Sequence, residues 1–106
     1  MTGGMKIAGL IGLAARAGKA WGGVSAVEAA VKRGEARLLL ISSDAGAAVT
    51  RKTAYISGQN GLPVMKAALS SAEMGGAMGK SGCAVCAVGE KNIADEIIRK
   101  IAGERL

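Results

Sequence analysis

Two unbroken apolar runs constrain the fold of this chain more than any other feature. Residues 38–41 read Leu-Leu-Leu-Ile, and residues 83–88 read Cys-Ala-Val-Cys-Ala-Val. Neither run alternates between apolar and polar residues, as a strand with one face in water would. Short runs of this kind are typical of central strands that helices cover on both faces. The sequence therefore predicts a sheet enclosed between two layers of helices.

Helical patterns surround these strands. We predict a first helix within residues 5–17 and a second from Ser25 to about Arg33. Ser42, Ser43 and Asp44 are expected to cap a third helix that runs to about Ser57. A fourth helix is predicted from Ser70 to about Gly79, and a last one after Gly89. A short strand is predicted over residues 62–65, where Pro63 is tolerated near the strand start. Alternating helices and strands favour a three-layer α/β/α sandwich around a central mixed sheet. A chain of 106 residues is expected to form this as a single domain, residues 1–106.

Local side-chain patterns refine these boundaries. Ser25 with Glu28, and Ser70 with Glu73, have the spacing of capping boxes at helix N-termini. The segment from Gly58 to Gly61 is expected to break the third helix. In the last helix, Asp95 is expected to pair with Arg99, and Glu96 with Lys100, because residues four apart share a helix face.

Few residues are suited to catalysis or metal binding. The chain has no histidine, and its two cysteines lie three apart in a predicted strand, where they point to opposite faces. We expect free thiols rather than a disulfide or zinc site, which fits a reducing cytoplasm. Gly79-Lys80-Ser81 resembles part of a P-loop, but it precedes a strand rather than a helix. The prediction is a non-enzymatic cytoplasmic protein with no cofactor, no metal and no small-molecule substrate. No uncharged stretch is long enough to span a membrane, so no membrane partner is expected.

The strongest candidate site is the turn Gly22-Gly23-Val24-Ser25. The chain carries 14 Lys and Arg residues against 8 acidic ones, a formal net charge of +6, which favours a polyanionic partner. Paired glycines allow a ligand to approach the backbone, and the helix that follows offers unsatisfied N–H groups. An ordinary turn followed by a helix cap is the alternative. Trp21, next to the turn, either stacks on a base or covers the edge of the core.

The order of several local strings resembles a known family. The strings are Gly-Leu-Ala-Ala-Arg-Ala-Gly-Lys at 12–19, Lys-Arg-Gly-Glu-Ala-Arg-Leu-Leu-Leu-Ile-Ser-Ser-Asp at 32–44, Leu-Pro-Val at 62–64 and Gly-Ala-Met-Gly-Lys at 76–80. Together they resemble the kink-turn-binding ribosomal protein superfamily of the archaeal L-seven-Ae type. Within it, the chain is most similar to the small bacterial YlxQ-type ribosome-associated proteins. The resemblance implies a ribosomal-protein-like, RNA-binding domain with an α/β/α sandwich fold.

The resemblance also implies where RNA would bind. The matching regions are residues 22–29, 42–45 and 80–83. The site residues expected from this and from the residues themselves are Arg16, Lys19, Gly22, Gly23, Val24, Ser25, Arg37, Ser43, Asp44, Lys80, Ser81 and Gly82.

One departure from the family affects specificity. Its kink-turn readers begin the second helix with Gly-x-Asn-Glu-x-x-Lys, whereas this chain has Ser25, Ala26 and Ala29 at the Asn, Glu and Lys positions. Alanine can neither read a base edge nor neutralise a phosphate. We therefore expect contact mainly through backbone phosphates of ribosomal or other structured RNA, with ribosomal proteins as further partners.

The alternative is a protein-interaction module that kept the fold and lost specific RNA binding. In that case Ala26, Ala29 and Ala30 would form a smooth partner-binding surface. A small-molecule enzyme would require a deep pocket lined by Ser43, Asp44 and Lys80.

Overall fold

The two apolar runs form the centre of the sheet. In the computed structural model, which describes residues 6–104, β2 (Leu38–Ile41) and β4 (Val85–Val88) are buried at every position. They pair antiparallel, with Leu40 opposite Cys86. The edge strands are β1 (Ala20–Gly22), antiparallel to β4, and β3 (Val64–Lys66), parallel to β2. The strand order β1-β4-β2-β3 confirms the predicted mixed sheet.

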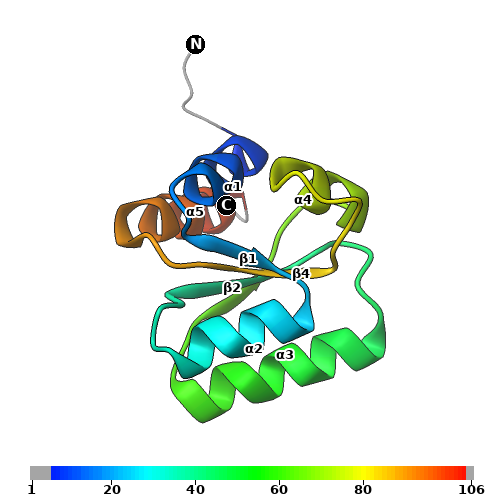
Figure 1. Cartoon of the computed structure of the whole chain (residues 1–106). Coiled ribbons are helices and arrows are strands. Elements are labelled where there is room, and N and C mark those ends of the chain that lie inside the picture. Colours follow the sequence, from blue (N-terminus) through cyan, green and yellow to red (C-terminus); the bar gives the residue numbers. More distant parts are fainter. Residues whose placement is uncertain (1–5, 105–106) are drawn as a thin grey trace.

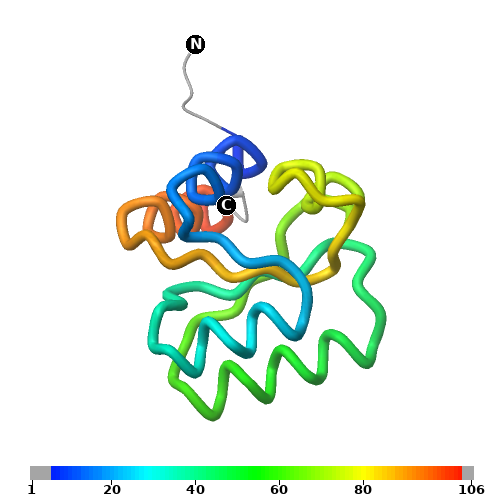
Figure 2. Tube along the Cα trace, in the orientation of Figure 1, coloured from blue at the N-terminus to red at the C-terminus, as the bar shows by residue number. Residues whose placement is uncertain are grey.

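Helices cover both faces of this sheet (Figure 1). On one face lie α1 (Ile7–Arg16), α4 (Ser71–Ala77) and α5 (Lys91–Glu104), and on the other lie α2 (Val24–Lys32) and α3 (Ala47–Asn60). The tube view in Figure 2 shows the same three layers, with α2 and α3 running side by side. The three-layer α/β/α sandwich is therefore confirmed.

Each helical layer seals its own apolar core. Side chains of α1, α4 and α5 pack on alternate strand residues such as Leu38, Leu40 and Cys86. The other core centres on Leu39, which contacts residues of α2 and α3. The alternation of strand side chains thus divides an almost wholly aliphatic core into two layers.

Strand β1 was not predicted. The strand has only three residues, and Gly22 has a low propensity for strands, so the sequence contains no local strand signal there. The strand exists because it pairs with β4, an interaction that only the tertiary fold supplies. Strand β4 is shorter than predicted: the N–H of Cys83 donates to the carbonyl of Ser71 at 3.1 Å instead of joining the sheet. Strand β3 also lies slightly later than expected, from Val64 to Lys66.

The expected start of the second helix is wrong. The helix begins at Val24, because the carbonyl of Gly23 accepts from the N–H of Val27 at 3.0 Å. Ser25 therefore lies inside the first turn and makes no capping hydrogen bond. Glu28 instead forms an ion pair with Lys52 of α3, at 3.1 Å.

The third helix is displaced from its expected boundaries. Ser42 continues the sheet, with its N–H donating to the carbonyl of Ala84 at 2.9 Å, so it cannot cap a helix. Helix α3 begins only after Gly46 and continues through Gly58 to Asn60. It ends at Gly61, whose φ of 62° suits a helix-terminating glycine. The expected start of the first helix near Met5 lies outside the described residues.

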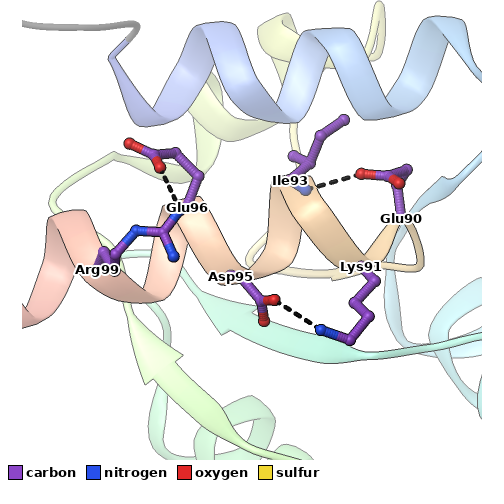
Figure 3. Close-up of polar contacts among 6 residues, drawn as sticks. All are labelled: Glu90, Lys91, Ile93, Asp95, Glu96 and Arg99. Atoms are coloured by element: carbon purple, nitrogen blue, oxygen red, sulfur yellow. Dashed lines mark hydrogen bonds and ion pairs between the residues drawn. The ribbon is translucent and has the colours of Figure 1, made fainter.

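The ion pairs on α5 differ from those expected (Figure 3). Lys91 pairs with Asp95 at 3.0 Å, and Arg99 pairs with Glu96 at 2.6 Å. Arg99 thus reaches back three residues rather than four, and both acids are engaged by other cations than predicted. The capping box of Ser70 and Glu73 at the start of α4 is confirmed.

Candidate nucleic-acid interface

The sheet register brings three of the predicted site segments to one end of the sheet. Gly22 ends β1 opposite Cys86, and Ile41 ends β2 opposite Val85, at the start of β4. The chain enters β4 from the loop 78–84 at this same end. The turn before α2, the loop after β2 and the loop before β4 are therefore neighbours in space.

The two glycines of the turn serve different purposes. A Cβ on Gly22 would lie 2.9 Å from Cε of Met78 and 3.2 Å from Cδ of Lys80, so side chains crowd this position. Gly23 has open space around it, but its φ of 92° and ψ of 153° fall where L residues are strained. Gly22 thus lets the loop before β4 close over the turn, and Gly23 redirects the chain into α2.

The start of α2 exposes unsatisfied donors. Among residues 6–104, no acceptor pairs with the N–H groups of Val24, Ser25 and Ala26, and the first turn holds no acidic residue. These donors and the helix dipole give this end the equivalent of about half a positive charge. Lys80 adds one full positive charge; it is exposed, and its aliphatic stem lies against Gly22. The arrangement is suited to a phosphate group.

Cys83 ends the matched region 80–83, but the sequence did not single it out as a site residue. Its half-buried thiol would lie 3.1 Å from a Cβ on Gly22. Burial raises the pKa of this thiol, while the nearby charge of Lys80 and a contact with the Gly23 backbone act in the opposite direction. The thiol is therefore neutral, and it adds packing rather than charge. Cys83 and Cys86 are both free, as predicted.

Asp44 ties the loop after β2 to helix α4. Its carboxylate accepts from the Oγ of Ser42 at 2.8 Å and from the N–H of Ser71 at 2.9 Å. These two hydrogen bonds lower the pKa of Asp44. The N–H of Ser43 donates to the carbonyl of Leu69 at 2.7 Å, which holds the same loop from its other side. Asp44 therefore caps α4 rather than α3, the helix for which it was predicted.

The loop before β4 rests directly on α4. A Cβ on Gly75 would lie 2.6 Å from the backbone nitrogen of Gly82, so only glycine permits this approach. The N–H of Lys80 also donates to the carbonyl of Gly75 at 2.8 Å. The exposed residues Ser81 and Gly82 complete the loop. Gly75 thus positions Lys80, a role that its place in a helix did not reveal.

Two predicted site cations, Lys19 and Arg37, do not join this group. Lys19 precedes β1 and Arg37 precedes β2, and both lie where β4 ends. Arg16 ends α1, and its guanidinium lies 3.8 Å from a Cβ built on Gly12, which would itself lie 3.2 Å from the carbonyl of Ala77 in α4. Ser42 is five positions after Arg37 along β2, which is about 17 Å of extended chain. Sequence proximity to the turn was misleading, because β1 carries the chain from one end of the sheet to the other.

Trp21 covers the edge of the core, the second of its two predicted roles. Its ring is half-buried against the core of α2 and α3. A Cβ on Gly89 would lie 2.8 Å from the ring, and the guanidinium of Arg33 lies 5.9 Å from the ring centroid. Both contacts fix the ring in place.

A pocket of about 250 Å³ lies elsewhere, between α2 and α3. It is lined by Glu28, Val31, Lys32, Tyr55, Ile56, Gln59 and Asn60. It includes none of Ser43, Asp44 and Lys80, which the enzyme alternative required. Within the described residues, no helix is long and apolar enough to cross a bilayer.

These observations define a class: an α/β/α sandwich whose exposed helix N-terminus and basic loop meet at one end of a mixed sheet. A family model of the ribosomal protein L7Ae/L30e/S12e/Gadd45 family matches residues 5–98. The chain belongs to this family, as the resemblance indicated.

Two solved structures share this fold. A protein of unknown function from Bacillus halodurans C is 31% identical, with a TM-score of 0.80, covering 89% of this chain and 94% of that one. The Giardia lamblia 15.5kD RNA binding protein has the same fold, with a TM-score of 0.72 at 22% identity, covering 92% of this chain and 85% of that one. A search of curated proteins finds no match.

Proposed function

We propose that this chain is a non-enzymatic, cytoplasmic RNA-binding protein that contacts structured, kink-turn-like RNA of the ribosome or another ribonucleoprotein. The observation that carries the proposal is the uncapped N-terminus of α2 beside Lys80, at the end of the sheet where three loops meet. Membership of a ribosomal protein family and the RNA-binding name of the Giardia protein support it.

Contact is made mainly to phosphates. The N–H groups of Val24, Ser25 and Ala26 are donors without side-chain selectivity, and Lys80 is a point charge. Ser25 lies within the first turn of α2, and its exposed hydroxyl is the single polar side chain there. Such a surface holds an RNA backbone in register but reads few base edges.

The first test compares a kink-turn RNA with a plain duplex of equal length, by gel shift at two salt concentrations. For each phosphate neutralised, log K should fall by roughly 0.7–0.9 for each tenfold increase in salt concentration. Preference for the kink-turn supports shape recognition, and equal salt-sensitive binding limits the interface to backbone contact. RNA affinity that does not change with salt concentration would contradict contact through phosphates.

A second test places a negative charge at the site. Ser25→Asp suits a helix N-terminus and should not destabilise the fold. It should weaken RNA binding, because two like charges about 4 Å apart cost about 1 kcal/mol in water and about 4 kcal/mol at an effective dielectric of about 20. That range corresponds to about fivefold to several hundredfold.

The matched control for this variant is Ala54→Asp, which adds the same charge to the exposed surface of α3. Thermal midpoints show whether both variants are folded. If Ser25→Asp and Ala54→Asp bind RNA equally well, RNA does not meet the N-terminus of α2.

The protein-interaction alternative depends on a smaller surface than the sequence implied. Ala30 is fully buried and cannot contact a partner, whereas Ala29 is exposed. Exposed apolar area is found instead at Tyr55, 64% accessible, beside the pocket between α2 and α3. Failure to bind either RNA, together with a protein partner that resists ribonuclease, would favour this alternative.

A further inference from the structure

The cations left out of the candidate interface gather at the opposite end of the sheet. The N–H of Gly89 donates to the carbonyl of Lys19, and the N–H of Arg37 donates to the carbonyl of Val88, both at 2.8 Å. Lys19 and Arg37 thus flank the end of β4 on its two sides. Neighbouring strands lie about 4.8 Å apart, so the two backbones are about 10 Å from each other.

Lys19 lies on the face of the sheet that α2 covers. Its carbonyl accepts from the N–H of Gly89 in register with the pairing of β1 and β4, and Trp21, two residues later on the same face, belongs to the core of α2 and α3. Lys19 therefore lies toward α2, whose C-cap is Arg33. Arg37 lies opposite Val88 together with Leu38, as in a β-bulge, four residues after Arg33 at the same end of the sheet.

Arg33 is the third cation of this group. Its guanidinium lies 5.9 Å from the ring centroid of Trp21 and 3.0 Å from the carboxylate of Glu35. We call Lys19, Arg33 and Arg37 the α2 C-terminal surface. All three are exposed.

Of the acidic residues close to this surface, Glu35 and Asp95 pair with cations, whereas Glu90 has only a backbone N–H as its partner and keeps its charge. Glu35 pairs with Arg33, and Glu90 accepts from the N–H of Ile93 at 2.8 Å. Asp95 pairs with Lys91 (Figure 3). Within residues 6–104, neither Lys19 nor Arg37 takes part in an ion pair.

The helix dipole does not cancel this charge. The surface carries three cations against the carboxylates of Glu35 and Glu90 and the equivalent of about half a negative charge at the C-terminus of α2. The surface therefore keeps a small positive charge, and the backbones of Lys19 and Arg37 lie about 10 Å apart across the strand end.

We propose that the α2 C-terminal surface is a second RNA contact, which holds the phosphates of another segment of the RNA bound at the N-terminus of α2. This inference rests on the proposed function. Arg33 is ten positions after Gly23, and at about 1.5 Å per helical residue the two surfaces are about 15 Å apart. One RNA molecule that crosses α2 can reach both.

The test measures RNA affinity across a series of salt concentrations for the full chain and its variants. The probe is a kink-turn RNA whose stem extends well beyond about 15 Å. Lys19→Ala with Arg37→Ala removes two cations of the surface and spares Arg33, which packs on Trp21. The control, Arg99→Ala with Lys100→Ala, lowers the net charge equally but acts on α5, across the sheet.

The double variant should lower the slope of log K against log salt by about 1.4–1.8, which is about 25- to 60-fold in affinity at about 0.1 M salt. The α5 control should leave the slope close to wild type. If both double variants have the same slope, the second contact does not exist.

Failure of the two proposals can be distinguished. If Ser25→Asp weakens binding and Lys19→Ala with Arg37→Ala does not, the candidate interface stands without a second contact. If Lys19→Ala with Arg37→Ala weakens binding and Ser25→Asp does not, RNA binds at the C-terminal surface and the proposed site is wrong.

Discussion

The contact between Gly75 and Gly82 allows a direct test of how the interface is positioned. Gly75→Ala would place a Cβ 2.6 Å from the backbone nitrogen and 2.9 Å from the backbone carbon of Gly82. Neither atom can move without displacing the loop that carries Lys80. Gly76→Ala is the matched control, since a Cβ there meets nothing within 4 Å.

The two variants isolate the cost of the contact. Both replace a glycine near the end of the same helix, so both gain a similar helix propensity of up to about 1 kcal/mol. Only Gly75→Ala adds an overpacking cost, which is about 1–3 kcal/mol for an inserted methyl group. The free energy of unfolding of Gly75→Ala should therefore lie about 1–3 kcal/mol below that of Gly76→Ala.

Thermal and urea unfolding measure this difference. For a domain of this size, it corresponds to melting midpoints separated by about 4–12 °C. RNA affinity should fall for Gly75→Ala at temperatures where both variants are folded, because the loop with Lys80 is displaced. Unfolding free energies within about 0.5 kcal/mol of each other would refute the reasoning that this contact positions the loop.

Two further predictions concern the helix caps. Ser25→Ala should change the free energy of unfolding by less than about 0.5 kcal/mol, whereas Ser70→Ala should lower it by about 1 kcal/mol, because only Ser70 accepts a capping hydrogen bond. Equal losses of stability in urea titrations would contradict the helix start at Val24. The pKa of Asp44 is lowered from 3.8, so its hydrogen bonds stabilise the fold above that pH and are lost as pH falls through the lower native pKa. Between about pH 5 and pH 2, the wild type should therefore lose more stability than Asp44→Asn, and parallel pH profiles of the two would argue against the link to Ser71.

The sequence was informative where a signal is local. The doubly buried strands β2 and β4, the capping box at Ser70 and the glycine that ends α1 all follow from residue type and spacing over a few positions. The layered fold followed from these elements, since apolar strands of this kind require cover on both faces.

The boundaries around the site depended on partners far along the chain. Ser42 is of a residue type that commonly caps helices, but its N–H donates to the carbonyl of Ala84 and so extends the sheet. Asp44 was placed at α3 and instead holds α4, whose first N–H is 27 positions away. Neither partner can be identified from neighbouring residues.

By itself, the sequence determined that a glycine-rich turn precedes a helix in a basic α/β/α domain, because these are properties of composition and short-range pattern. Only the tertiary structure decided what shares a surface with that turn. The pairing of β1 with β4 brings Lys80 against Gly22 and carries Lys19 away from it. The physical reason is that sheet register sets which loops meet at each end, and register depends on contacts between distant residues.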